Sequence, residues 1–428
     1  MIRYCRRCLY PSNHPLGISF DAAGVCSGCR VHEEKDRLDW RERERKLAAI
    51  FDAYRDRSGL RYDCVVPVSG ARDSFFIVDT VRRRYGMTPL LVSYNAHYNT
   101  RMGIRNLARL RTLTDGDFLQ QVVQPQVVKR VMRATLRMAA SFHWQSLAGQ
   151  TVYPVQIAAR LKIPLIVWGV HQGCDQVGMY SHLDEVEMSR KYRCEHDLMG
   201  LEAEDLEGGE EALTEAELRP FTYPHDREIE RVGVRGIYLS NYIRWDSKAQ
   251  HEAMLARYGY ETGPQQRTFD TYNDVDSVHY SGVHDWIKFR KWGYGKATDH
   301  ASREIRLRRL TRDAGISYAR KYAEVEPVDL PHLLQFAGLS REEFDGLVDA
   351  NRDPRAWKRD ASGRWVLGHP VWADMGSYPE AALTRREPSC EFAVTPPRAA
   401  EPSDGGYTLL NPGWVHDGPA WAEPGGMA

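Results

Sequence analysis

Residues 65–74, with the sequence VVPVSGARDS, have the residue types of a phosphate-binding loop. An apolar strand, a turn of small residues and a helix start follow one another, so backbone N–H groups and a helix N-terminus can face an anion. Ser69 and Ser74 can donate hydroxyl hydrogen bonds to phosphate oxygens. Arg72 can neutralise charge, and Asp73 can cap the helix or contact Mg²⁺. The Walker A spacing is absent. From these residues alone, an ordinary strand–turn–helix junction explains the stretch equally well.

Four cysteines form a second candidate site, namely Cys5, Cys8, Cys26 and Cys29. Two C-x2-C pairs at this separation are typical of a structural zinc site with four thiolate ligands. An iron–sulfur cluster is the competing interpretation. The short pairs, with glycines around and within the second one, favour zinc. A closed four-thiolate site has no open coordination position, so we expect a structural role, in docking a partner or capping the active site.

A third group of candidates lies between residues 279 and 306, where His, Asp, Lys and Arg alternate with Gly and aromatic residues. Residues 293–296, Gly-Tyr-Gly-Lys, resemble a further backbone turn near an anion. Surface ion pairs on a charged helix would explain the charges but not the glycines and aromatics, so we favour a functional role. The candidate catalytic residues here are Lys296 and His300. The candidate substrate-binding residues are His284, Asp285, Lys288, Lys291, Asp299, Arg303, Glu304 and Arg306.

The segment from Trp168 to Asp175 follows a predicted buried strand. Ligands of parallel sheets bind at the carboxyl ends of strands, so this segment should face the loop at 69–74. Trp168 and Gly169 are therefore candidates for contacting a bound nucleotide. His171 and Asp175 could contact substrate or metal, although each is also an ordinary loop residue type.

Alternating strands and helices from about residue 60 must position these groups. Hydrophobic patterning predicts strands at 62–68, 89–94, 118–123 and 163–167, and helices at 73–85, 102–113, 127–142 and 152–161. Such alternation predicts a doubly wound α/β fold, in which helices cover both faces of a parallel sheet.

The sequence divides into five predicted parts. They are a four-cysteine module at 1–35, a helical connector at 36–58, a nucleotide-binding domain at 59–300 with an insertion at 175–300, a helical region at 301–371, and a Pro/Gly-rich tail at 372–428.

The composition narrows the function classes. Among 428 residues, 58 basic side chains balance 58 acidic ones, which argues against a large nucleic-acid interface. The N-terminal residues lack the apolar stretch of a signal peptide, and no window approaches the roughly 20 apolar residues of a membrane span. We expect a cytoplasmic protein with reduced thiols.

The loop at 69–74 resembles the S-G-G-x-D-S signature of PP-loop ATP pyrophosphatases, whose fold is adenine nucleotide alpha hydrolase-like. Ala71 stands where the second glycine is usual, which would cost free energy if that position needed a positive φ.

A more specific resemblance combines this loop with the four-cysteine knuckle, the Trp-Gly pair and the motif H-D-x-x-K-F-x-K-x-G-Y-G-K-A-T-D-H-A-x-x-E-I-R, which begins at His284. With these features, residues 1 to about 360 are similar to the N-acetyl sugar amidotransferases of bacterial surface-polysaccharide and nonulosonic-acid biosynthesis. The tail lies outside the similarity.

The resemblance implies an enzyme that converts an acetamido group of a nucleotide- or lipid-linked sugar into an acetamidino group. ATP would adenylate the amide oxygen, and ammonia would then displace AMP. The implied cofactors are ATP, Mg²⁺ and a structural Zn²⁺. The implied catalytic residues are Arg72, Asp73, Lys296 and His300. The implied ATP-binding residues are Ser69, Gly70, Ala71, Arg72, Asp73, Ser74, Trp168 and Gly169.

The sequence contains neither a G-x-C-x-G nucleophile motif nor an N-terminal Cys, so the resemblance implies that a separate glutamine amidotransferase subunit supplies ammonia. Free ammonia or another amine is the alternative source.

Two other functions stay open. A PP-loop tRNA sulfurtransferase would use the same adenylation, but the zero net charge and the lack of a C-x-x-C pair around Cys174 and Cys194 argue against it. The third candidate is a non-catalytic scaffold or a natural-product enzyme that acts on another amide.

Overall fold

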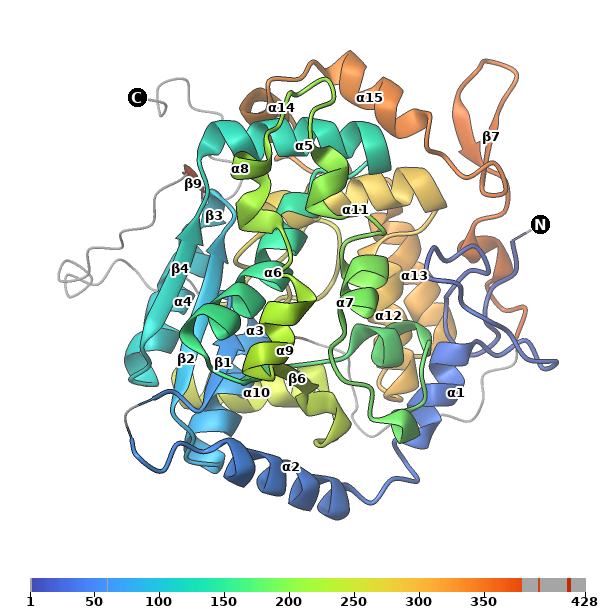
Figure 1. Ribbon diagram of the computed structural model, residues 1–428. Helices are drawn as coiled ribbons and strands as arrows, with labels where there is room; N and C mark the ends of the chain where they lie inside the picture. Colours follow the sequence, from blue (N-terminus) through green and yellow to red (C-terminus); the bar gives the residue numbers. More distant parts are fainter. Residues whose placement is uncertain (1, 60, 379–391, 393–413, 417–428) are drawn as a thin grey trace.

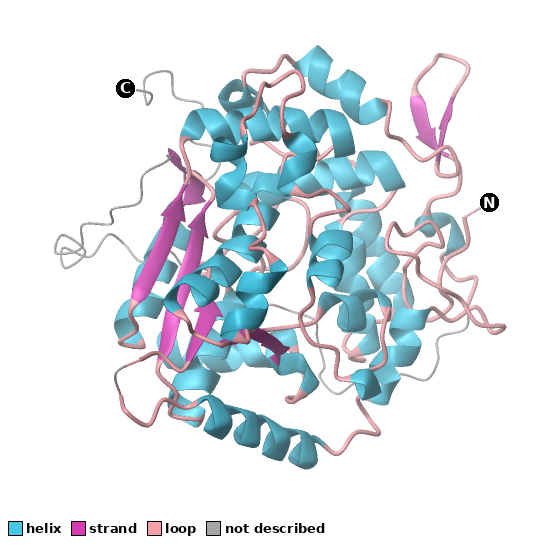
Figure 2. Cartoon of the chain, viewed as in Figure 1, coloured by secondary structure: helices cyan, strands magenta, loops and turns pink. Residues whose placement is uncertain are grey.

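Five parallel strands form the central sheet of the protein (Figures 1 and 2). The computed structural model describes residues 2–59, 61–378, 392 and 414–416. The strands are β1 (Cys64–Pro67), β2 (Pro89–Asn95), β4 (Phe118–Val122), β5 (Leu165–Trp168) and β6 (Arg235–Tyr238), in the order β4-β2-β1-β5-β6. The chain adds strands on one side of β1 and then on the other, so the winding direction reverses between β1 and β5. Such a switch point is where open α/β sheets bind ligands.

Helices cover both faces of this sheet. On one face the apolar core includes side chains of α2 (Trp40–Tyr54), α3 (Arg72–Val78), α4 (Arg101–Leu113) and α10 (Ser247–Tyr258). On the other face it includes α6 (Trp144–Leu161) and α9 (Asp226–Val232). The predicted α/β architecture with a parallel sheet is therefore confirmed.

The predicted elements differ from the observed ones in several places, and α6 begins at Trp144, eight residues before the helix expected at 152–161. The helix expected at 73–85 consists of α3 followed by a π-helical turn at Asp79–Arg84. The helix expected at 127–142 is α5 (Pro125–Ala139), which ends where Ala140 adopts a left-handed conformation. The edge strand β6 lies inside the predicted insertion, where its four residues give too short an apolar run to be recognised.

A helical region follows the sheet in sequence. Its elements are α11 (Val278–Trp292), α12 (Lys296–Arg306), α13 (Arg312–Ala323), α14 (Leu330–Ala337), α15 (Arg341–Asp349), and a hairpin of β7 (Trp357–Arg359) and β8 (Trp365–Leu367). The shorter helices α7 (Arg190–Tyr192) and α8 (Glu215–Leu218) precede it.

The N-terminal segment packs onto this helical region rather than onto the sheet (Figure 1). Its single helix, α1 (Ser27–Glu34), follows Cys26 directly. Leu9 shares one apolar core with Ile305 of α12 and Ile316 of α13. Two segments almost 300 residues apart in sequence therefore form one structural unit.

Most of the predicted tail lies outside the described residues. The described parts of it are residues 372–378, Phe392 and β9 (Trp414–His416). Strand β9 pairs in parallel with β3 (Tyr98–Thr100). No helix within the described residues has both the length and the hydrophobicity that crossing a bilayer requires.

Candidate active site

A cavity of about 430 Å³ opens at the carboxyl ends of β1, β5 and β6. Ser69, Ala71 and Asp73 line it after β1, and Trp168 and Gly169 line it at and after β5. The structure thus brings these five predicted nucleotide-binding residues together at the switch point of the sheet.

A second cavity of about 240 Å³ adjoins the first one. Both are lined by Val170, Gln172, Asn273 and Asp274, so these residues form the boundary between them. The second cavity is also lined by five of the predicted catalytic and substrate-binding residues, namely Lys296, Asp299, His300, Arg303 and Arg306.

The loop after β1 is held by close backbone packing. A Cβ atom on Gly70 would lie 2.3 Å from the carbonyl oxygen of Gly103, and one on Gly103 would lie 2.4 Å from the Cα of Asp276. Three chain segments therefore approach so closely that only glycine fits at two of them. Ala71 has φ −102° and ψ 172°, which is extended backbone, so an alanine fits there without strain.

Serine hydroxyls fix the shape of this loop. Ser74 Oγ accepts a hydrogen bond from the Ser69 N–H at 2.9 Å, and Ser69 Oγ accepts one from the Ala71 N–H at 3.2 Å. The Ser69 hydroxyl also hydrogen-bonds the carboxyl of Asp276. Within the described residues, no side chain makes a capping hydrogen bond at the start of α3, which begins at Arg72, so its first N–H groups can face an anion. The side chain of Arg72 lies outside the described part of the structure.

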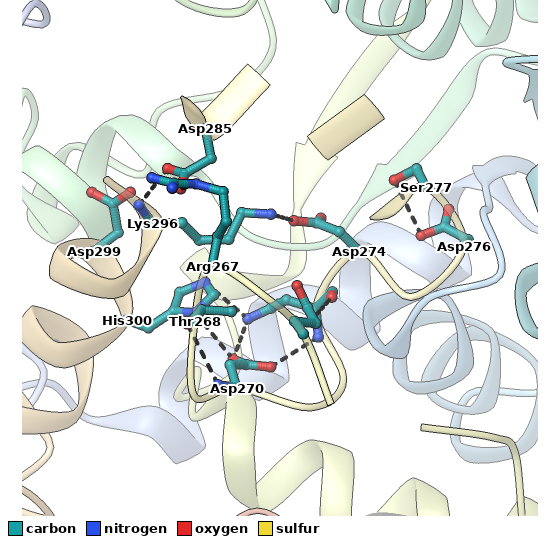
Figure 3. Close-up of polar contacts among 12 residues, drawn as sticks. Arg267, Thr268, Asp270, Asp274, Asp276, Ser277, Asp285, Lys296, Asp299 and His300 are labelled. Atoms are coloured by element: carbon teal, nitrogen blue, oxygen red, sulfur yellow. Dashed lines mark hydrogen bonds and ion pairs between the residues drawn. The ribbon is translucent and has the colours of Figure 1, made fainter. Parts of the chain in front are cut away.

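The segment before α11 forms a polar wall, in which Asn273 and Asp274 line both cavities and Asp276 and Ser277 line the first one. Figure 3 shows Asp274, Asp276 and Ser277 with their neighbours. Lys296 Nζ donates to Asp274 Oδ2 at 2.6 Å. Burial opposes the charge on Lys296, but the carboxylates of Asp274 and Asp285 outweigh it and raise the lysine pKa. Lys296 therefore presents a stable positive charge at the second cavity.

Asp276 has an unusual protonation equilibrium. Burial and the nearby charge of Asp274 raise its pKa to about 6, although hydrogen bonds to Ser69 and Gly70 act in the opposite direction. It lies beside the loop after β1, so the charge of this wall changes near neutral pH.

His300 is neutral and hydrogen-bonded on both sides of its ring (Figure 3). Nδ1 lies 2.7 Å from Thr268 Oγ1, and Asn273 Nδ2 donates to Nε2 at 3.2 Å. Burial lowers the histidine pKa to about 3. Since the protein occupies both ring nitrogens, His300 orients Asn273 rather than offering a nitrogen to a ligand.

Other predicted substrate-binding residues make contacts inside the protein instead of lining either cavity. Asp285 forms a buried ion pair with Arg267 at 2.6 Å, and Glu304 is buried between Arg303 and Arg309 at 2.7 and 2.6 Å. The remaining contacts are those of Lys288 with Asp299, of Lys291 with the Ala139 carbonyl, and of His284 with the ring of His143.

His171 and two loop residues are also placed away from the cavity surface. His171 is fully buried, with its ring 4.4 Å from that of Tyr192 and 4.5 Å from that of Tyr238. Gly70 and Ser74 support the loop from behind.

Several cavity residues were not predicted from the sequence. His143 precedes α6, and burial lowers its pKa to about 4. The run Asn273-Asp274-Val275-Asp276-Ser277 carried a signal, because a D-x-D pair flanked by Asn and Ser in a non-helical segment is a polar cluster. His143 and Arg193 had no such signal.

The four predicted metal ligands converge at one buried site. The sulfur atoms of Cys5, Cys8, Cys26 and Cys29 all lie within 4.8 Å of one another. The Cys5–Cys29 and Cys8–Cys26 Sγ–Sγ distances are 4.0 and 3.6 Å. Tetrahedral zinc with Zn–S bonds of about 2.3 Å separates its sulfurs by about 3.8 Å, so the residues fit a structural Zn²⁺.

Arg306 connects the cysteine cluster with the second cavity, which it lines. Its guanidinium donates to the sulfurs of Cys29 at 3.4 Å and Cys26 at 3.5 Å, and to the carbonyl oxygen of Gln176 at 2.7 Å. The cluster thus supports one wall of the cavity.

Comparison with known proteins gives one relationship. Residues 266–371, about a quarter of the chain, match the family model "LPS biosynthesis protein WbpG-like, C-terminal domain". No curated protein matches the chain. The matched segment contains α11 to α15 and the five predicted residues that line the second cavity. The second cavity therefore lies largely in a segment similar to lipopolysaccharide-biosynthesis proteins.

Proposed function

We propose that the protein is an ATP-dependent amidotransferase of polysaccharide biosynthesis, which converts the acetamido group of a sugar into an acetamidino group. The observation that carries the proposal is the junction of the two cavities. A loop with the residue types of an ATP pyrophosphatase lines one cavity, and the segment similar to lipopolysaccharide-biosynthesis proteins lines most of the other.

The first cavity would hold ATP. The N–H groups at the start of α3 and the hydroxyl of Ser69, which lines the cavity, would bind its phosphates. Asp73 offers carboxylate oxygens, which Mg²⁺ prefers, and the bound ion would neutralise phosphate charge. Arg72 is the proposed further cation of this loop.

The second cavity would hold the acetamido group at its boundary with the first. Lys296 supplies a fixed positive charge there, and Asp274 orients it. His300 holds Asn273 in the same boundary, which is a positioning role. Prearranged charge of this kind stabilises the negative charge that develops on phosphate oxygens in the transition state.

The reaction balances in two steps. The amide oxygen attacks the α-phosphorus of ATP, and pyrophosphate leaves as the P–O bond breaks. Ammonia then attacks the imidate carbon, the nitrogen loses a proton, and the C–O bond breaks to release AMP with the former amide oxygen. Adenylation is needed because an amide oxygen is otherwise a poor leaving group.

The proposed ammonia source is a separate glutamine amidotransferase subunit. Ammonium ions should therefore support the reaction of the isolated protein, whereas glutamine alone should not.

The decisive assay measures pyrophosphate and AMP formed from ATP, Mg²⁺, ammonium and a panel of acetamido sugar nucleotides. Asp73→Asn should lower the rate at least about a hundredfold, since it removes the carboxylate that would bind Mg²⁺ beside the phosphates. Asp52→Asn is the matched control, because Asp52 lies exposed on α2 away from both cavities. If no acetamido sugar yields pyrophosphate, or if Asp73→Asn is as active as Asp52→Asn, the proposed function is wrong.

A further inference from the structure

Two polar side chains in one wall of the first cavity have donor groups without protein partners. Arg193 and Tyr238 are 5% and 3% exposed. Within the described structure, no hydrogen-bond partner contacts Arg193 Nε, Arg193 Nη2 or Tyr238 Oη. Arg193 and Tyr238 line the cavity. Buried donors that lack an acceptor cost free energy, and native proteins rarely leave several of them together.

The guanidinium of Arg193 is rigidly held. It stacks on the ring of Trp168 at 3.8 Å and lies 5.6 Å from the ring of Tyr238. Its Nη1 donates to Asp197 at 2.5 Å, and Asp197 also contacts His196 at 2.7 Å. One edge of the guanidinium is thus fixed by a carboxylate, while Nε and Nη2 keep their donor capacity.

The chemistry of the set selects an acceptor-rich ligand. An arginine side chain has donors only, and a neutral phenol can donate its proton. Burial raises the pKa of Tyr238, so its phenol is neutral. A phosphate or carboxylate oxygen is the group that accepts from an arginine and a phenol together.

The position of the set separates it from the nucleotide loop. Trp168 ends β5 and Tyr238 ends β6, whereas the loop follows β1. With neighbouring strands about 4.8 Å apart, the ends of β1 and β6 lie about 10 Å apart in the order β1-β5-β6. A ligand in this cavity can therefore present one end to the loop and an anionic end to Arg193.

We propose that Arg193 and Tyr238 form an oxyanion subsite that binds a phosphate or carboxylate group of the sugar substrate. The identity of the ligand as the sugar rests on the proposed function. The subsite gives the enzyme a preference for acidic or phosphate-linked acetamido sugars over neutral ones.

The test measures binding to the full chain by isothermal titration calorimetry. The probes are N-acetylglucosamine, its carboxylate analogue N-acetylglucosaminuronic acid, and its diphosphate-linked form UDP-N-acetylglucosamine. At least one anionic probe should bind the unaltered protein at least tenfold more tightly than the neutral sugar. The probe that does so identifies the anion as carboxylate or phosphate. Equal affinity for all three probes would refute the subsite.

Arg193→Met should reduce the affinity for the preferred anion to that for the neutral sugar. Arg190→Met is the matched control, because Arg190 lies three residues earlier, pairs with Glu202 at 2.9 Å and lines neither cavity. A non-hydrolysable ATP analogue should bind Arg193→Met with unchanged affinity. If its affinity falls by the same factor as that of the sugar probe, the anion belongs to the nucleotide and the proposal is wrong.

Tyr238 gives a second, independent measurement. In the ligand-free protein, Tyr238→Phe removes a buried hydroxyl that lacks a partner, so the melting temperature should stay equal or rise. The same variant should weaken binding of the anionic probe at least fivefold, and unchanged binding would contradict the subsite even if Arg193→Met does not fold. Arg193-dependent anion binding without pyrophosphate formation would leave the subsite intact and refute only the amidotransferase reaction.

Discussion

Gly70 shows how a single hydrogen atom in place of a side chain shapes the loop after β1. A methyl group there would overlap the Gly103 carbonyl at 2.3 Å, whereas Ala71 next to it has extended backbone and ordinary space. In the S-G-G-x-D-S signature, Ala71 stands where the second glycine is usual. In the structure, it is the first glycine, Gly70, whose position has no room for a side chain.

We therefore predict opposite tolerances at these neighbouring positions. Gly70→Ala should destabilise the protein by about 2 kcal/mol through overpacking and should abolish pyrophosphate release. Ala71→Gly should change the unfolding free energy by less than about 1 kcal/mol and retain activity. Urea unfolding and the pyrophosphate assay check both variants, and equal behaviour of the two would contradict the packing argument.

Asp276 gives a prediction about pH. Its pKa is about 6 in the folded protein and 3.8 in the unfolded chain, so the folded state binds more protons between these values. Stability at this residue is thus lost as pH rises through the window, and the loss is complete above about pH 6. At about pH 8 the unfolding free energy of Asp276→Asn should exceed that of the unaltered protein by about 1–2 kcal/mol, after allowance for partial exposure. At about pH 5 the two unfolding free energies should differ by less. A difference independent of pH would show that Asp274 and burial do not perturb this carboxyl.

At the residue scale, the cavity residues that belong to a continuous sequence motif could be predicted, whereas those that reach the cavity only through tertiary packing could not. Ser69, Asp73 and Lys296 belong to continuous motifs. His143 and Arg193 reach the cavity only because α6 and the segment after α7 pack beside the sheet, and no local pattern encodes that.

At the scale of elements, α12 carries both cavity residues and structural ion pairs. Lys296, Asp299, His300, Arg303 and Arg306 line the second cavity. Glu304 lines neither cavity, is fully buried, and accepts from Arg303 and Arg309. One residue of this predicted substrate-binding set therefore serves to hold the helix in place.

Removing the charge of Glu304 should be costly. Glu304→Gln removes the buried carboxylate that Arg303 and Arg309 share, although each keeps one further partner, Asp270 and Asp246 respectively, and we expect a loss of about 3 kcal/mol in unfolding free energy. The matched control is Glu326→Gln, since Glu326 pairs with Arg341 at 2.8 Å on the surface and should contribute less than about 1 kcal/mol. Chemical denaturation of both variants measures the difference, and similar losses would mean that the Glu304 network is not effectively buried.

Element prediction succeeded where hydrophobic runs were long. The strands at 64–67, 89–95, 118–122 and 165–168 were all predicted within a few residues. The edge strand β6 was not, because four residues that begin with an arginine lack a periodic signal. The π-helical turn after α3 begins at Asp79, which pairs with Arg257, 178 residues away, a long-range contact that no local pattern encodes.

At the scale of the whole molecule, the cysteine cluster couples the N-terminus to the helical region. Cys26→Ser should lose about one equivalent of zinc and lower the melting temperature, because binding a structural metal contributes directly to folding. Zinc content by mass spectrometry and thermal unfolding check this. Cys194→Ser is the control, since Cys194 lies outside the cluster. This variant should keep its zinc. Unchanged zinc in the Cys26 variant would exclude the four-thiolate site.

The contact of Arg306 with the cysteine sulfurs also has a consequence for biosynthesis. All four thiols leave the ribosome within the first 29 residues, but Arg306 follows Cys26 by 280 residues. At a translation rate of roughly 5–20 residues per second, roughly 15 to 60 s pass between the synthesis of the four cysteines and that of helix α12, which covers them. During that interval the nascent thiols are open to exchange or oxidation, so correct metal loading must occur early and survive until synthesis of α12 closes the site.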